Sequence, residues 1–161
     1  MSSQKEDSQL SRTDKESIRS LNAFKDIENS NLNDIFYHGK IIYFKEGWPL
    51  SNIDEINSKI YFILSGNARL IGINNDKLFT IIKLHQGDSI GLASLLRGES
   101  CEQVSASTEL KVFVLEDNQI FNLYKKDNYF KSWCDKTIFP CEIASFSQSI
   151  SKLTNKKDIK N

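Results

Sequence analysis

The sequence lacks a long hydrophobic run, an apolar leader and an excess of charge of either sign. No stretch approaches the ~20 apolar residues that span a bilayer. Residues 1–14 are polar, so neither a membrane span nor a signal peptide is predicted. The chain contains 21 Lys and Arg against 21 Asp and Glu, a formal net charge of +0. We therefore expect no nucleic-acid partner, and contact with a membrane only through another protein or a linked segment.

Catalytic and metal-binding patterns are also missing from the sequence. It has two histidines and three cysteines, Cys101, Cys134 and Cys141, whose spacing is unlike that of metal sites. The odd number favours reduced cytosolic thiols, and Cys101 has no resolving cysteine near it in the sequence. No Ser/His/Asp or Cys/His set and no phosphate-loop lysine motif is present. We therefore predict no catalytic residue, no metal ligand and no enzymatic activity in this chain.

The first part of the chain is predicted to be a polar leader followed by packing helices. Residues 1–16 contain too little apolar surface to offset the entropy of ordering, which predicts a disordered leader. A helical pattern begins at Ser17, is interrupted by residues 29–31 and resumes as a short turn over 32–36. Its first apolar residues are spaced to share one face: Ile18, Leu21, Phe24 and Ile27.

The middle of the chain changes to the period of β-strands. Strands are predicted over residues 40–44, 59–64, 69–73, 77–84, 103–107 and 111–115. Asn74–Asp76 suits a left-handed turn between two of them, and Trp48 opens a polar loop that runs to about Ser58. Many short strands separated by turn residues favour an antiparallel barrel or sandwich over a βαβ sheet. The predicted domain covers residues 17–126.

Helical periodicity returns after this domain. A helix is predicted from Asp117, a second around Phe130, and a third opened by Pro140. The third carries one apolar stripe: Ile143, Phe146, Ile150 and Leu153. The stripe either docks on the β domain of the same chain or forms a homodimer. Residues 127–161 are thus predicted to be C-terminal helices and a basic tail.

One glycine-punctuated stretch, Gly87–Gly98, is the candidate functional segment. Gly87 and Gly91 suit a tight turn and a close backbone approach, because glycine tolerates positive φ and has no Cβ. Residues 92–96 are long enough for one helical turn on a scaffold. The N-terminus of such a turn presents free N–H groups that suit an anion such as a phosphate.

Three segments together resemble the cyclic-nucleotide-binding domain family. They are Phe44–Gly47 (FKEG), Tyr61–Leu70 (YFILSGNARL) and Gly87–Gly91 (GDSIG), and the resemblance covers roughly residues 21–124. The family implies an antiparallel jelly-roll-like β-barrel with flanking helices. Residues 90–107 are similar to a variant found at the N-terminus of cyanobacterial ABC exporters, ahead of a peptidase and a transporter core. That resemblance implies a cytoplasmic domain tethered to the inner membrane through the transporter.

The sequence departs from the family pattern at two ligand positions. The family binds its ligand with the stretch that corresponds here to residues 87–103, which we call the cassette. In members that bind cyclic AMP or cyclic GMP, a glutamate that accepts the ribose hydroxyl follows the second glycine of the cassette, and here that position is Leu92. The phosphate-pairing arginine is replaced by Ser100-Cys101, with the carboxylate of Glu102 beside it. Each hydrogen bond to a charged group contributes ~1.5–3 kcal/mol, so the loss of both could turn a micromolar site into a millimolar one. We predict weak or absent cyclic-nucleotide binding.

The remaining cassette residues still allow a degenerate site that binds another ligand. Arg97 is either an anion ligand or a solvated arginine paired with Glu99, and Glu102 and Gln103 are either ligand contacts or polar residues of the barrel rim. No cofactor is assigned beyond a weakly bound cyclic nucleotide or another anion. The candidate ligand residues are Gly91, Leu92, Ala93, Ser94, Arg97, Ser100, Cys101, Glu102 and Ser105.

Three functions remain open from the sequence. The first is a regulatory or docking domain of a peptide-exporting ABC transporter, whose partners are the downstream transporter and peptidase domains. The second is the sensor half of a Crp-type transcription regulator, without its DNA-binding module in this chain. The third is a structural domain that docks on another protein or forms a homodimer through the C-terminal helices. In the first two, the helix after Pro140 is expected to be the output element.

Overall fold

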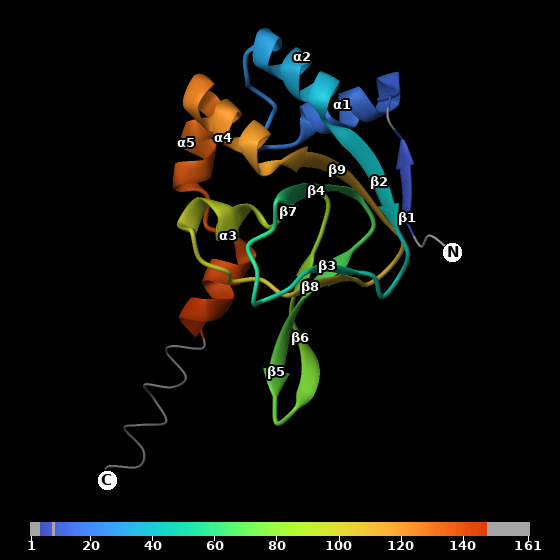
Figure 1. Cartoon of the computed structure of the whole chain (residues 1–161), viewed down its shortest axis with the longest axis vertical. Helices are drawn as coiled ribbons and strands as arrows, with labels where there is room; N and C mark the ends of the chain where they lie inside the picture. The colour runs from blue at the N-terminus through green and yellow to red at the C-terminus, as the bar shows by residue number, and fades with distance from the viewer. Residues whose placement is uncertain (1–3, 8, 148–161) are drawn as a thin grey trace.

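Two antiparallel sheets form the centre of the structure, and helices from both ends of the sequence lie beside each other at one end of it (Figure 1). The computed structural model describes residues 4–7 and 9–147. One sheet has the strand order β1-β2-β9-β4-β7 and the other the order β3-β8-β5-β6. Strands distant in sequence are neighbours in both sheets, as in a jelly roll. The predicted fold class is confirmed.

The elements follow one another as helices, strands and helices. The strands are β1 (Gln4–Asp7), β2 (Lys40–Phe44), β3 (Pro49–Ser51), β4 (Lys59–Ser65), β5 (Ala68–Asn74), β6 (Lys77–Leu84), β7 (Ser89–Ile90), β8 (Val104–Ala106) and β9 (Leu110–Glu116). The labelled helices are α1 (Arg12–Ser20), α2 (Asn29–His38), α3 (Leu92–Arg97), α4 (Asp117–Lys126) and α5 (Asn128–Lys136). Residues 140–147 are also helical. Among the described helices, none has the length and hydropathy needed to cross a membrane.

The six predicted strands are all present, and β1, β3 and β7 are additional. Asn75 and Asp76 adopt left-handed φ values of 49° and 61°, which confirms the turn between β5 and β6. The prediction that a loop begins at Trp48 is wrong for its first residues, because Pro49–Ser51 forms strand β3. Its pairing with β8 depends on contacts with a distant segment, including the bond from the Ala106 N–H to the Trp48 carbonyl. Pro49 is tolerated because β3 is an edge strand.

The predicted leader is the largest difference at the N-terminal end. Residues 4–7 pair with β2 as an edge strand, and α1 begins at Arg12 rather than at Ser17. The backbone hydrogen bonds between strands depend little on side-chain composition, so a polar segment can still form an edge strand. The start of α1 is fixed by a capping box between Ser11 and Asp14. Asp14 also forms an ion pair of 2.6 Å with Lys111 on β9, so a polar residue ties this segment to the sheet.

The apolar stripe predicted for the first helix is buried but does not lie on one helix. Leu21, Phe24 and Ile27 are buried in turns between α1 and α2. Asn29 starts α2 instead of interrupting a helix. The ring of Phe24 contacts Phe62 on β4 edge-to-face at 4.7 Å and stacks on Phe130 of α5 at 5.9 Å. The N-terminal segment, the sheet and the C-terminal helices therefore share one aromatic core.

The helix predicted to start at Pro140 is present, but at its described positions the apolar stripe does not dock on the β domain, which was one of the two alternatives. Cys141 and Ala144 are buried, whereas Ile143 and Phe146 are 49% and 67% exposed. The predicted positions Ile150 and Leu153 lie outside the described residues. Apolar periodicity alone did not indicate the buried face, because the small residues are the ones that fit against the β domain.

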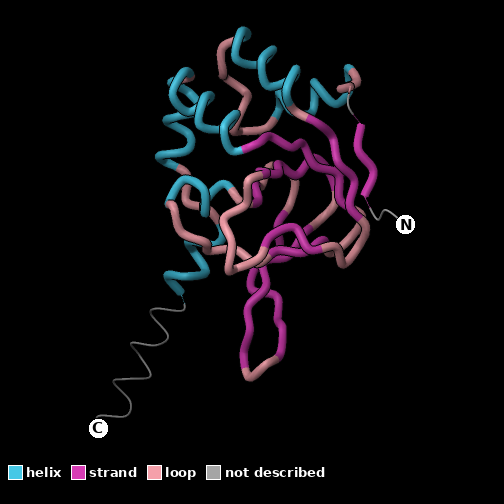
Figure 2. The backbone as a smooth tube through the Cα atoms, in the orientation of Figure 1, coloured by secondary structure: helices cyan, strands magenta, loops and turns pink. Residues whose placement is uncertain are grey.

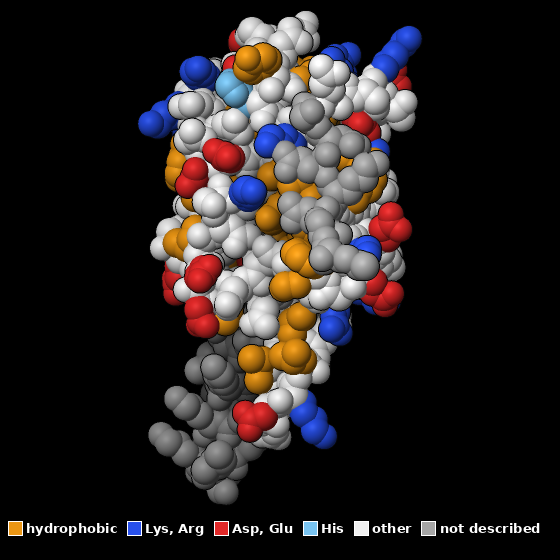
Figure 3. All heavy atoms as spheres, turned by 45° about the vertical axis from the view of Figure 1, so that its right-hand side comes forward, with side chains coloured by type: hydrophobic (Ala, Val, Ile, Leu, Met, Phe, Trp, Pro, Cys, Tyr) orange, Lys and Arg blue, Asp and Glu red, His pale blue; other side chains and the backbone are white. Residues whose placement is uncertain are grey.

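The β5–β6 hairpin extends away from the body of the molecule (Figure 2). Apolar side chains are visible where it projects in the space-filling view (Figure 3), and its exposed large residues are Ile73, Leu78 and Phe79. The inner half of this hairpin supplies one wall of the pocket described below.

Candidate functional site

The glycine-punctuated stretch folds as a tight connection between β7 and β8, with α3 at its centre. Gly91 is the N-cap of α3 with a φ of 90°, and Gly98 is its C-cap with a φ of 68°. A Cβ placed on Gly91 would lie 3.1 Å from the Ile60 side chain and 3.2 Å from that of Asn57. The predicted turn and close approach at Gly91 are therefore both present.

Three predicted ligand residues point into the protein interior. Leu92, Ala93 and Ser94 are all buried, and Leu92 is among the largest fully buried side chains. The hydroxyl of Ser94 accepts a hydrogen bond from the Cys101 backbone N–H at 3.1 Å. These residues hold α3 against the sheet, so Leu92 offers a ligand neither an acceptor nor a surface.

The carboxylate of Glu102 occupies the start of α3. Its Oε2 accepts a hydrogen bond of 3.0 Å from the Gly91 backbone N–H, and its Oε1 accepts one of 3.4 Å from the Ser94 hydroxyl. The side chain is only 4% exposed, so Glu102 is not the barrel-rim residue considered from the sequence. Burial raises the pKa of this carboxyl, and the bonds from Gly91 and Ser94 partly oppose that effect.

Arg97 pairs with a residue that the sequence analysis did not select. Its Nε lies 2.6 Å from Oε1 of Glu142 in the last helix, and not against Glu99. This bond raises the pKa of the arginine further, so the cation is permanent. Glu142 Oε2 also accepts the Phe139 backbone N–H, which fixes the start of the helix. Arg97 therefore connects α3 to the C-terminal helix.

The other predicted residues divide between the cassette and the sheet. Ser100 donates a hydrogen bond to the Asn52 carbonyl at 3.3 Å. Ser105 on β8 accepts one from Arg69 on β5, also at 3.3 Å. Arg69 and Ser105 are paired across the strands, and their neighbours Leu70 and Val104 face the other side of the sheet. The structure therefore does not bring Ser105 to the cassette.

A pocket of about 650 Å³ lies between the cassette, the β5–β6 hairpin and helix 140–147. Its floor and hairpin wall are apolar, with Leu70, Ile71 and Ile81 among their residues. The cassette contributes Arg97, Ser100, Cys101 and Gln103, and the helix contributes Cys141, Glu142 and Ser145. Among the described lining residues, Arg97 is the one cation, and Glu142 neutralises it. The pocket thus combines apolar walls with a polar rim that carries no net positive charge.

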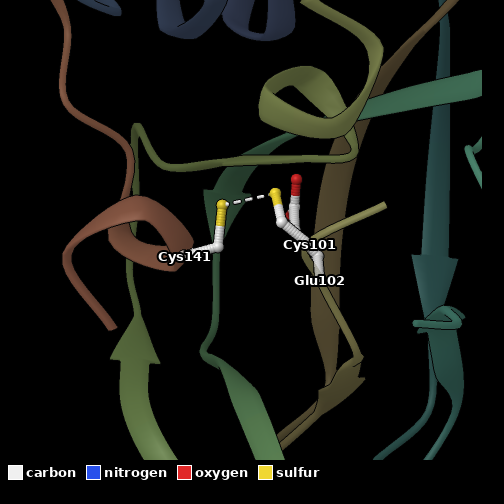
Figure 4. Close-up of side chains that lie close together, drawn as sticks. All are labelled: Cys101, Glu102 and Cys141. Carbon is white, nitrogen blue, oxygen red and sulfur yellow. Dashed lines mark hydrogen bonds between the residues drawn. The ribbon is translucent and has the colours of Figure 1, made fainter. Parts of the chain in front are cut away.

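Sequence reasoning missed Cys141 and Glu142. Both lie in the first turn of helix 140–147, about 40 residues after the cassette. The cysteine count included Cys141, but nothing in the sequence indicated that it lies beside Cys101. The Cys101 and Cys141 Sγ atoms are 3.1 Å apart (Figure 4).

Comparisons with known proteins identify the fold. The model of the cyclic nucleotide-binding domain family matches residues 41–127. A search of curated proteins found no match. Similar solved structures include the protein kinase A regulatory domain from Toxoplasma gondii with cAMP. This pair has a TM-score of 0.65 and 14% identity, over 72% of this chain and 46% of that one.

Two further structures show the same likeness. The regulatory subunit of a cAMP-independent protein kinase A from Trypanosoma cruzi, bound to guanosine, has a TM-score of 0.67 and 16% identity, over 87% of this chain and 48% of that one. A cyclic nucleotide-binding-like protein from Brucella abortus has a TM-score of 0.59 and 15% identity, over 71% and 99%. At these identities the likeness concerns the fold. The chain spans about half the length of the two kinase subunits.

Proposed function

This chain belongs to the cyclic nucleotide-binding domain family, and we propose that it is a non-catalytic regulatory domain whose own carboxylate occupies the anion position of the cassette. The observation that carries this proposal is the 3.0 Å hydrogen bond from the Gly91 backbone N–H to Oε2 of Glu102. From the sequence, the N–H group at the start of α3 was expected to donate a hydrogen bond to a phosphate. In this protein a buried side chain takes that bond.

A cyclic nucleotide meets three further obstacles in this cassette. It would have to displace the Glu102 carboxylate or lie beside it, and like charges repel strongly in a buried site. The position of the family's arginine corresponds to Ser100-Cys101, and the guanidinium of Arg97, in the same cassette, is already paired with Glu142. The family's glutamate position is Leu92, which is buried in the core. Ordinary cyclic AMP and cyclic GMP are therefore expected to bind weakly or not at all.

An uncharged ligand is a second candidate, favoured by the composition of the pocket. The pocket has apolar walls and a polar rim with no unpaired cation among its described residues. A neutral nucleoside would place no charge against Glu102. The structure of the Trypanosoma cruzi protein is bound to guanosine, which makes guanosine a rational first probe of the uncharged class.

We place the domain in the cytoplasm, as the N-terminal regulatory part of a peptide-exporting ABC transporter. The support is the similarity of residues 90–107 to such exporters, together with helix 140–147, which presents Ile143 and Phe146 on its exposed side. This assignment requires the reading frame to continue past Asn161 into a peptidase-like segment with a catalytic cysteine. A helix-turn-helix in that place would instead favour a Crp-type transcription regulator. A homodimer by light scattering would favour the structural alternative.

The test of the cassette is isothermal titration calorimetry with cyclic AMP, cyclic GMP, cyclic dinucleotides and guanosine. We expect dissociation constants above about 100 µM for the cyclic nucleotides, because two charge-assisted contacts are missing. The double variant Cys101→Arg/Glu102→Ala restores a guanidinium and frees the Gly91 N–H. It should bind a cyclic nucleotide at least about tenfold more tightly than the parent chain.

The matched control is Cys101→Arg/Glu99→Ala, which adds the same cation but removes an exposed carboxylate of the same loop. If the control gains as much affinity as the test variant, Glu102 is not the blocking group. Micromolar binding of a cyclic nucleotide to the parent chain would overturn the proposal directly.

A further inference from the structure

Two thiols meet at the rim of the pocket from segments that are 40 residues apart in sequence. Cys101 lies in the loop between α3 and β8, and Cys141 lies in the first turn of helix 140–147. Their Sγ atoms are 3.1 Å apart, and Figure 4 shows the side chains directed toward each other. Both residues line the pocket. The third cysteine, Cys134, is fully buried in α5.

We propose that Cys101 and Cys141 form a reversible redox pair, which a low-molecular-weight disulfide oxidises to an intramolecular disulfide that links the cassette to helix 140–147. The sulfur atoms must approach from 3.1 Å to about 2.05 Å. A loop residue and a residue in the first turn of a helix can make this movement more easily than residues within a sheet. The inference does not depend on which ligand the pocket binds.

The surroundings give the two cysteines different roles. Hydrogen bonding with Cys141 lowers the pKa of Cys101; burial opposes this, and a further contact with Ser94 supports it. The same bond and burial raise the pKa of Cys141. Cys101 is half-buried and faces the pocket, whereas Cys141 is buried. Cys101 is therefore the attacking thiolate and Cys141 the resolving thiol.

The reaction balances as two thiol–disulfide exchanges. The Cys101 thiolate attacks one sulfur of the small disulfide, forming a mixed disulfide and releasing one small thiolate. That thiolate takes up the proton of Cys141. The Cys141 sulfur then attacks Sγ of Cys101, forms the Cys101–Cys141 bond and releases the second small thiolate, which solvent protonates. Two protein thiols lose two electrons, and one small disulfide is reduced to two thiols.

The same cluster is less well suited to a metal ion. Cys101, Cys141 and Glu102 place one ligand atom each within 4.8 Å of one another. Both oxygens of Glu102, however, already accept hydrogen bonds from the start of α3. That leaves two uncommitted thiols, whereas zinc sites normally use at least three protein ligands.

The test is equilibration of the fully reduced chain with oxidised glutathione, followed by thiol counting and non-reducing peptide mass spectrometry. We expect two of the three thiols to be lost and a single crosslinked peptide pair that contains Cys101 and Cys141. Cys141→Ser should stop at a mixed disulfide of glutathione on Cys101. Cys101→Ser should carry no glutathione on Cys141, because the attacking thiolate is gone.

Cys134→Ser is the matched control, because it removes the buried cysteine outside the pair. Burial raises the pKa of Cys134 to about 12, so this variant should form the crosslink as the parent chain does. Retention of all three thiols, or a crosslink through Cys134, would overturn the proposal. So would purified chain that holds one equivalent of a divalent metal by elemental analysis and loses it in both Cys101→Ser and Cys141→Ser.

The structural consequence can be measured separately by amide hydrogen exchange. Oxidation should slow exchange in helix 140–147 at least tenfold in the parent chain and in Cys134→Ser. It should leave the rates in Cys141→Ser unchanged. Equal exchange rates in the oxidised and reduced parent chain would show that the disulfide does not restrain the helix, and would overturn the link to the C-terminal segment.

Discussion

The helices at the two ends of the chain attach to the β domain in different ways. The N-terminal segment inserts Phe24 among three other phenylalanine rings of the core, and Asp14 and Asp127 add buried polar contacts. Helix 140–147 contributes the small buried residues Cys141 and Ala144. Its polar contacts include the partly exposed pair of Arg97 and Glu142 and the thiol contact with Cys101.

This difference separates a structural attachment from one that can be regulated. Burial of a phenylalanine side chain contributes several kcal/mol and does not respond to solution chemistry. An exposed ion pair contributes little, and a thiol pair changes with the redox state. The C-terminal attachment is therefore the weaker of the two, and the one whose strength a small molecule can change.

Phe24→Ala should produce the largest effect on the N-terminal attachment. Truncation of a fully buried phenylalanine costs about 3–5 kcal/mol in the free energy of unfolding, measured here by urea denaturation. The control is Phe121→Ala, because Phe121 is 41% exposed on α4 and should cost less than about 1 kcal/mol. Equal losses in the two variants would contradict the assignment of Phe24 to the core.

Asp127→Ala should have the next largest effect. The Asp127 carboxylate accepts hydrogen bonds from the Glu28 backbone N–H, the Asn31 side chain and the Phe130 backbone N–H, so it joins α2 to the N-cap of α5. Leaving these donors without a partner should cost about 2–4 kcal/mol of unfolding free energy by urea denaturation. Asp54→Ala, an exposed loop substitution, should be close to neutral.

Asp127 should also contribute to the pH dependence of stability. Burial alone raises the pKa of its carboxyl, but the bonds from Phe130, Asn31 and Glu28 outweigh this and lower it. A folded-state pKa below the unfolded value stabilises the protein above the unfolded pKa of ~3.9. This stabilisation is lost as the pH falls through the folded pKa. The difference in unfolding free energy between the parent chain and Asp127→Asn should therefore shrink below about pH 4, and a constant difference would contradict the shift.

Arg97→Ala should have the smallest effect on global stability and a local effect on the last helix. The Arg97 side chain is 44% exposed, so its pair with Glu142 contributes at most about 1 kcal/mol. We expect little change in the urea midpoint but faster hydrogen exchange in residues 140–147. Arg12→Ala, which removes an exposed ion pair within α1, should leave hydrogen exchange in residues 140–147 unchanged. A large global loss would show that the C-terminal attachment is part of the core.

Most of the β domain could be predicted because its signals are local. The strand periods, the Asn75-Asp76 turn and the glycine at position 91 each follow from side-chain alternation or from a backbone dihedral requirement. The edge strands β1 and β3 could not be predicted. Their residues do not alternate clearly, and they become strands only through hydrogen bonds to β2 and β8.

The local structure of the cassette could be predicted, but its long-range contacts could not. The sequence indicated the short helix and the absence of the family's arginine at Ser100-Cys101. It did not indicate that Glu102 would turn inward, because a glutamate in a polar loop is normally solvated. The partner of Arg97 was assigned to the neighbouring Glu99, whereas packing of the last helix brings Glu142 to it.

The sequence by itself determined the fold family, six of the strands and the residue types that stand at the family's ligand positions. These features depend on residue types and on patterns of apolar and polar side chains that repeat every few residues. The tertiary structure alone decided that Glu102 fills the start of α3, that Cys141 and Ala144 form the buried face of the last helix, and that Cys101 meets Cys141. These contacts join segments that are distant in sequence; Cys101 and Cys141 alone are 40 residues apart. Which atoms meet there depends on how a helix packs on a sheet, and no local pattern records that.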